Sequence, residues 1–207
     1  MSVDTASAEL HSHVIAEDTG FAPNVIGGVC TLATCKQVIR REATEGDWVL
    51  GTNPRDAGEE RITYLMRVDE KLTYESYYKS GRFDFKEPEE DPVGDNIYYR
   101  NDRGVVVQVE DAPFHDTDAC RERDRKSNHV LISNHFWYFG DQAPELPSDL
   151  RDSVIKGYKT SSRSGRKKPT KHLDALLEWI TERYETGVHG KPRDGTAGSC
   201  GYEPDPC

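Results

Sequence analysis

Three side chains in the sequence have the chemistry of a catalytic group, namely Cys35, Asp18 and His135. Cys35 falls in the first turn of a helix expected over Thr34 to Ala43, beside Lys36, where the helix dipole and the cation would both lower the pKa of a thiol. Asp18 could act as a general acid or general base, or its carboxylate could accept a hydrogen bond from the edge of a nucleobase. The alternative is that Asp18 is a cap or turn residue, a common role of Asp. The sequence leaves open whether the chain is an enzyme.

A metal site receives little support from the spacing of potential ligands. His115, Cys120, His129 and His135 follow no familiar zinc pattern, and the cysteines form no CxxC pair. The sequence also contains no P-loop, no dinucleotide fingerprint and no deaminase signature. It therefore predicts neither a metal nor a cofactor.

The segment from Asp18 to Gly51 carries the strongest local signal for binding. Gly27 and Gly28 permit positive φ and close approach of a ligand to the main chain. Thr34 with Gln37 three residues later forms a capping-box pattern, and a helix start with Lys36, Arg40 and Arg41 suits an anion or a carbonyl-rich ligand. A tight strand-to-helix connection with a solvated basic face is the alternative. The predicted ligand-binding residues here are Phe21, Asn24, Gly27, Gly28, Thr34, Lys36 and Arg40.

An aromatic run supplies a second candidate binding surface. Phe136, Trp137, Tyr138 and Phe139 follow Asn134 and His135, and alternate residues of a strand face opposite sides. Such a wall could stack an unpaired base, at roughly 1–3 kcal/mol per base. Core packing is the alternative. Predicted ligand-binding residues in this group are Trp48, Asn134, Phe136, Trp137 and Tyr138.

A basic run lies in a chain whose net charge is −10. No acidic residue occurs from Lys156 to Lys171, and the Ser and Gly content indicates a loop between helices. The run predicts contacts with a phosphate backbone, although a merely solvated loop is the alternative. The predicted contact residues are Lys159, Arg163, Arg166, Lys167 and Lys168.

Several motifs together resemble a known family. They are GFAPN, TLATCK, IRR, GDWVLG, RVDEKLTYESYY, GDNIYYR and HVLISNHFWYFG, between Val14 and Phe139. In this order they resemble the nucleotide modification associated domain of the second type, which is associated with DNA base modification. The resemblance implies a nucleotide-related context but no particular reaction.

The elements that must position these residues are mostly short strands. Ile62 to Val68 alternates with the period of a half-buried strand, and Thr73 should cap a short helix. Ile97–Arg100 and Val105–Val109, joined by Asn-Asp-Arg-Gly, predict a hairpin. The order is similar to PUA-like domains, so we expect an α+β fold: a mainly antiparallel PUA-like β-barrel with flanking helices and a C-terminal helical extension.

Length and composition set the expected organisation. The 207 residues allow a disordered N-terminus (1–12), a PUA-like domain (13–145), a helical extension with the basic loop (146–187) and a disordered tail (188–207). No signal peptide and no long apolar run occur, and five cysteines fit a reducing compartment, so we expect a cytoplasmic protein without membrane contact.

Three functions remain open at this point. The leading hypothesis is a module that binds a nucleotide or modified base. The others are an enzyme acting on a nucleotide or DNA base, and a structural subunit of a DNA modification or restriction complex. The expected partners are a nucleotide or nucleic acid, with DNA favoured, and proteins of a modification system.

Overall fold

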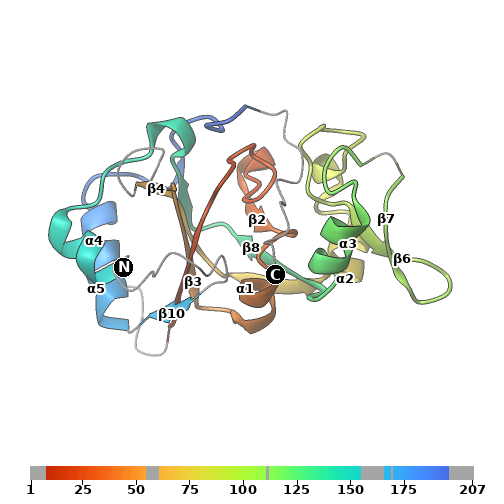
Figure 1. Ribbon diagram of the computed structural model, residues 1–207, viewed down its shortest axis with the longest axis horizontal. Coiled ribbons are helices and arrows are strands. Elements are labelled where there is room, and N and C mark those ends of the chain that lie inside the picture. The colour runs from red at the N-terminus through yellow and green to blue at the C-terminus, as the bar shows by residue number, and fades with distance from the viewer. Residues whose placement is uncertain (1–7, 55–60, 111, 155–165, 169, 196–207) are drawn as a thin grey trace, which may run out of the picture.

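The computed structural model describes residues 8–54, 61–110, 112–154, 166–168 and 170–195. The elements are arranged along one long axis in three parts (Figure 1). A six-stranded sheet covered by two helices lies at one end, a three-stranded sheet with α1 lies in the middle, and α2, α3 and a projecting hairpin form the other end.

The six-stranded sheet has the order β10-β1-β3-β4-β9-β11. Its strands are β1 (Leu10–Val14), β3 (Trp48–Thr52), β4 (Ile62–Arg67), β9 (Phe136–Tyr138), β10 (Arg166–Lys168) and β11 (Gly187–Val188). β1 pairs in parallel with β3, and β11 in parallel with β9, whereas the other pairs are antiparallel.

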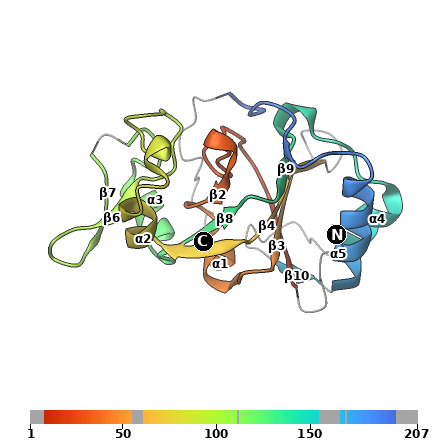
Figure 2. The same ribbon diagram turned by 180° about the vertical axis from the view of Figure 1, so that it is seen from behind.

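The middle sheet has the order β2-β8-β5, and a separate two-stranded sheet forms the hairpin. These strands are β2 (Cys30–Leu32), β5 (Glu70–Thr73), β8 (His129–Ser133), β6 (Tyr98–Arg100) and β7 (Val106–Gln108). The chain passes from β4 into β5 and from β8 into β9 through connections of two residues, so these segments cross from one sheet to the other (Figure 2). The hairpin predicted at Ile97–Val109 is β6 and β7.

The α+β fold class is confirmed, and most strand pairs are antiparallel. The described strands form separate open sheets rather than a closed barrel, so a PUA-like barrel is not confirmed. The two parallel pairings join strands that are separated along the chain by other elements, as the crossover of a parallel pair requires.

Five α-helices lie in the described residues: α1 (Gln37–Glu42), α2 (Tyr74–Lys79), α3 (Asp118–Asp124), α4 (Ser148–Val154) and α5 (Thr170–Thr181). Short 3₁₀ turns are η1 (Ile26–Gly28), η3 (Asp84–Lys86) and η4 (Gly140–Gln142). Thr73 caps α2 as predicted, since its side chain accepts from the Ser76 amide. Within the described part of the chain, no helix has both the length and the apolar character needed to cross a membrane.

The predicted helix start at Thr34 is wrong. α1 begins at Gln37, and its N-cap is Lys36 in the left-handed region with φ 31°, without a side-chain cap. Cys35 precedes it with φ 54°. The helix does not start at Thr34 because hydrogen bonds to distant residues hold the backbone of Cys35. The Cys35 N–H donates to Asp124, and the Cys35 carbonyl accepts from Arg40.

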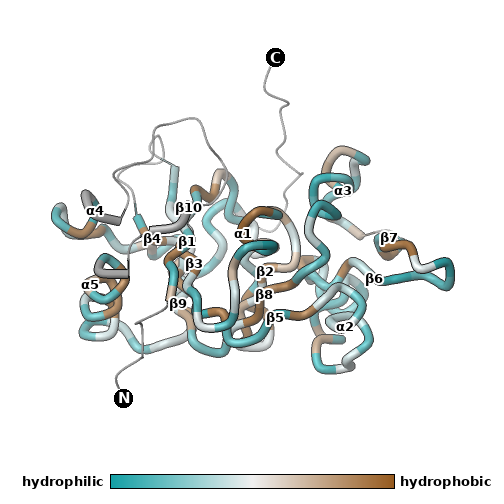
Figure 3. Tube along the Cα trace, turned by 90° about the horizontal axis from the view of Figure 1, so that it is seen from below, coloured by the Kyte–Doolittle hydropathy of each residue, from teal (hydrophilic) through white to brown (hydrophobic). Residues whose placement is uncertain are grey.

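Three hydrophobic clusters fill the spaces between these layers, and Figure 3 shows the apolar strands in the interior. The first lies between the six-stranded sheet and α4 and α5, the second between the two larger sheets, and the third around α2 and β6. β4 is therefore buried on both faces, whereas its alternating pattern predicts burial on one.

Both ends of the described chain contribute to the sheet. Ala8 and Leu10 are buried, and residues 187–195 carry β11 and several hydrogen bonds to the body. Gly20 illustrates the close packing, because a Cβ at this position would lie 2.8 Å from Cγ of Pro192. Ala8, Leu10 and residues 188–195 fall within the two stretches, 1–12 and 188–207, for which the sequence predicts disorder.

Candidate functional site

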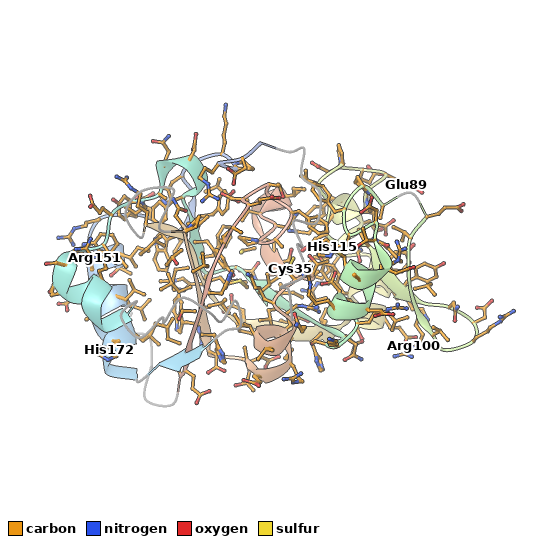
Figure 4. All side chains as sticks on the ribbon, viewed as in Figure 1. Cys35, Glu89, Arg100, His115, Arg151 and His172 are labelled. Carbon is orange, nitrogen blue, oxygen red and sulfur yellow. The ribbon has the colours of Figure 1, made fainter. Side chains whose placement is uncertain are left out.

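A cysteine, a histidine and an aspartate from three separate segments meet in the middle of the molecule. Cys35 Sγ lies 3.3 Å from Nε2 of His115, and Nδ1 of His115 is hydrogen-bonded to Oδ2 of Asp124. Figure 4 shows Cys35 and His115 close together between β2 and α3. A nucleophile, a base and a group that orients the base are the parts of a catalytic triad.

Cys35 is held by its own backbone. Its N–H donates to Oδ1 of Asp124 at 2.7 Å, and its carbonyl accepts from Nε of Arg40 at 2.8 Å. Positive φ at a non-glycine residue costs of order 1–3 kcal/mol and persists where the surroundings over-determine it. Cys35 and Lys36 both have such angles, 54° and 31°, so the thiol is held in place by a constrained turn.

His115 lies between β7 and α3, also with positive φ, 57°. Its ring meets Phe21 edge-on at a centroid distance of 5.1 Å, and Phe21 in turn stacks on Phe114 at 4.4 Å. His115 is 3% exposed. These rings therefore keep water from much of the imidazole while leaving Nε2 against the thiol.

Asp124 ends α3 and is fully buried. Its Oδ2 also accepts from the Tyr98 hydroxyl at 3.1 Å, and Arg40 Nη2 lies 3.9 Å from Oδ1. Arg40 is itself fully buried and donates to the carbonyls of Asp124, Ser127 and His129. The carboxylate therefore has several donors around it, as a buried charge requires.

The electrostatics favour a thiolate beside an imidazolium. Burial raises the pKa of the Cys35 thiol, but the facing His115 and, less strongly, Lys36 bring it below its usual range. Burial lowers the pKa of His115, yet the Cys35 thiolate and the Asp124 carboxylate raise it to about 10. Although burial raises the pKa of Asp124, His115 and Arg40 lower it overall.

The pKa of Cys35 is lowered as the sequence predicts, and Lys36 contributes to this as expected, but the predicted contribution of the helix dipole is wrong. Cys35 lies before the first turn of α1, so it does not occupy the helix position on which the dipole argument depends. His115 is the largest influence that lowers the pKa. The largest lowering influence on the pKa of Cys35 therefore comes from a residue 80 positions away along the chain.

Two groups of described residues bring three potential metal ligands together. One is Cys35, His115 and Asp124, and the other is Glu9, His11 and Asp47. In the first group, Oδ2 of Asp124 is already hydrogen-bonded to Nδ1 of His115. The Cys35 thiol and Nε2 of His115 therefore face each other. In the second, Asp47 accepts from the Glu9 and Thr44 amides, so it serves a turn.

The predicted binding residues near the glycine turn divide into two sets. Lys36 follows Cys35 in the chain, and Arg40 donates to the carbonyl of Cys35. Phe21 packs against His115, and Thr34 is buried with its hydroxyl unpaired. Asn24 lies elsewhere, in a buried network in which Lys86 Nζ donates to Oδ1 of Asn24 at 2.7 Å. Gly27 and Gly28 are exposed, with φ 69° and 75°.

The predicted aromatic wall is part of the core. The exposed fractions of Trp48, Phe136, Trp137 and Tyr138 are 2% or less. A base could stack on these rings only if the core opened, whereas Asn134 is exposed in the turn before β9. Their roles in binding stay predictions.

The other catalytic candidates occupy different surroundings. Asp18 accepts from the Tyr138 hydroxyl at 2.8 Å and from the Arg193 amide, and burial raises its pKa. His135 packs against Trp48 and Trp137, and burial lowers its pKa. Neither candidate belongs to the group around Cys35.

The predicted phosphate contacts are only partly described. Lys159 and Arg163 lie outside the described residues. Arg166, Lys167 and Lys168 form β10, which pairs with β1. Their contacts with nucleic acid stay a prediction.

The sequence does not indicate that His115 and Asp124 lie beside Cys35. The sequence suggests His115 only as a potential metal ligand, and Asp124 carries no local motif. A cysteine with a histidine and an aspartate elsewhere in the chain is the available signal, and it cannot specify which cysteine and which histidine come close in space.

The comparisons assign the chain to a family. No curated protein and no solved structure shows significant similarity to it. The family model described as nucleotide modification associated domain 2 matches residues 7–198, which is most of the chain and includes all three members of the Cys35 group. The chain therefore belongs to the nucleotide modification associated domain 2 family.

Proposed function

We propose that this protein is a thiol-dependent enzyme of nucleotide modification, with Cys35 as the nucleophile. The observation that carries the proposal is the 3.3 Å approach of Cys35 Sγ to Nε2 of His115, whose other nitrogen is bonded to Asp124. His115 acts as general base and acid, while Asp124 fixes its tautomer and orientation. The family supplies the nucleotide context.

The charge state supports this assignment. A thiolate, rather than a thiol, is the nucleophile, and a neighbouring imidazolium is the usual means of forming it at neutral pH. The lowered pKa of Cys35 and the raised pKa of His115 favour such a pair. The Cys35 residue as a whole is half-buried, although its thiol is enclosed enough for burial to raise its pKa.

Alkylation by iodoacetamide tests the proposal. Mass spectrometry measures the rate at Cys35 against pH, with and without a mixture of ribo- and deoxyribonucleoside monophosphates. We expect fast reaction well below the pH at which ordinary thiols react, and slower reaction with nucleotides present. The buried Cys30, whose pKa is raised to about 12, is the internal control. An ordinary thiol profile at Cys35 contradicts the assigned nucleophile.

A nucleotide-binding or modified-base-binding module is the second candidate. The exposed turn at Gly27 and Gly28 favours it, since a Cβ at Gly28 would have no atom within 4 Å. Calorimetry with the same nucleotides separates the two candidates. Loss of binding in Gly28→Val, with Cys35→Ser unchanged and no nucleotide-dependent protection of Cys35, supports the module. Protection of Cys35 with binding retained in Gly28→Val supports the enzyme.

A further inference from the structure

We infer that the reaction at Cys35 is acyl transfer: the thiolate takes an acyl group from an amide or ester and passes it to water or an amine. This inference rests on the proposed function, because it needs Cys35 to be the nucleophile. It adds the class of substrate, a carbonyl compound with a nitrogen or oxygen leaving group.

The first argument is the position of the proton. His115 Nε2 faces Sγ at 3.3 Å, so its proton lies next to any carbon that Sγ attacks. In acyl transfer the leaving group departs from that same carbon, and one acid beside the sulfur is sufficient. Addition to a pyrimidine ring requires a proton at a more distant ring atom, hence a second acid. The described polar contact of the Cys35 side chain is with His115.

The second argument concerns the thiols. Disulfide exchange needs a partner sulfur within reach and an accessible thiolate. Cys30, the other cysteine described as free, is fully buried with its pKa raised to about 12, and its Sγ faces Sδ of Met66 at 3.7 Å. Cys30 is thus placed for packing rather than for disulfide exchange with Cys35.

The step balances without an oxidant or reductant. The Cys35 thiolate attacks the carbonyl carbon, an S–C bond forms, and the C–N or C–O bond breaks as His115 Nε2–H protonates the departing amine or alcohol. Neutral His115 then takes a proton from water or an amine, which attacks the thioester. The S–C bond breaks and the thiolate returns.

The experiment uses the full chain and p-nitrophenyl acetate. Absorbance follows p-nitrophenolate, and mass spectrometry locates the acetyl group. We expect a rapid burst of one equivalent with acetyl on Cys35, followed by slower release that hydroxylamine accelerates. Cys35→Ser should show no burst, and His115→Gln should release the acetyl group at least about 100-fold more slowly.

Two further outcomes separate the inference from the proposed function. Rapid iodoacetamide alkylation without an acetyl-Cys35 intermediate overturns acyl transfer and leaves the nucleophile in place. A covalent adduct of Cys35 with 5-fluoro-2′-deoxyuridine monophosphate, together with no acetyl intermediate, also overturns it in favour of addition to the base. If the rate of iodoacetamide alkylation at Cys35 depends on pH as for an ordinary thiol, both the acyl-transfer inference and the proposed function are overturned.

Discussion

Nε of Arg40 donates a 2.8 Å hydrogen bond to the carbonyl of Cys35, which joins α1 to the residue that carries the thiol. The same guanidinium donates to the Tyr74 hydroxyl and to the Asp124 carbonyl. One buried cation therefore fixes the position of both the proposed nucleophile and the aspartate that orients the base. We regard Arg40 as a positioning residue, since it reaches the reacting sulfur only through other groups.

Arg40→Met should destabilise the protein by about 3–5 kcal/mol, because it leaves buried acceptors without a donor. Arg40→Lys keeps the charge but loses the forked geometry, so we expect an intermediate loss. Urea unfolding measures both variants. The neighbouring Arg41→Met is the matched control, since Arg41 is exposed and should change stability by no more than about 0.5 kcal/mol. Equal free energies of unfolding for Arg40→Met and Arg41→Met would contradict the role of Arg40 in fixing the positions of Cys35 and Asp124.

Asp124→Asn should lower the pKa of His115 from about 10, because it removes a carboxylate charge that raises it. The asparagine oxygen can still accept from the Cys35 amide, but its nitrogen then faces Nδ1 of His115 and can only donate, so the acceptor that orients the imidazole is lost as well. NMR titration of the imidazole measures the change. Asp118→Asn on the same helix is the control, since Asp118 is exposed and paired with Arg121. An unchanged His115 titration in Asp124→Asn would rule out the proposed coupling.

His13 should make the protein less stable as the pH falls below about 6.5. Its pKa is well below the ordinary value, owing to burial and to Lys36, so the folded chain keeps it neutral while the unfolded chain takes up a proton. Stability should then fall by about 1.4 kcal/mol per pH unit from this site. Urea unfolding at several pH values compares the protein with His13→Gln, which lacks this titration. If the free energy of unfolding changes with pH in the same way for the protein and for His13→Gln, the prediction is contradicted.

Gly27→Ala should cost more stability than Gly28→Ala. Both positions have positive φ, which costs about 1–2 kcal/mol for alanine. At Gly27 alone, the new Cβ would lie 2.3 Å from Cε2 of Phe85, and moving that ring should add roughly 1–3 kcal/mol. Phe85→Ala should remove this added cost in the double variant. Equal costs at the two glycines would show that Phe85 does not constrain the turn.

Local features of the fold were predictable from the sequence, whereas the site was not. The Thr73 cap and the β6–β7 hairpin depend on neighbouring residues, and both formed as predicted. The Thr34 cap failed because bonds to distant residues hold Cys35. The family was recognisable from its motifs, but no motif indicates that His115 and Asp124 meet Cys35, since tertiary structure alone brings them together.

The most direct test of the central claim is the thiolate absorbance of Cys35 near 240 nm as a function of pH. The difference between the protein and Cys35→Ser isolates this thiol, and His115→Gln shows the contribution of the imidazole, with exposed His189→Gln as control. We predict a thiolate that titrates below the usual range in the protein and in His189→Gln, and at a higher pH in His115→Gln. A midpoint at or above the ordinary thiol value, unaffected by His115→Gln, would contradict the account.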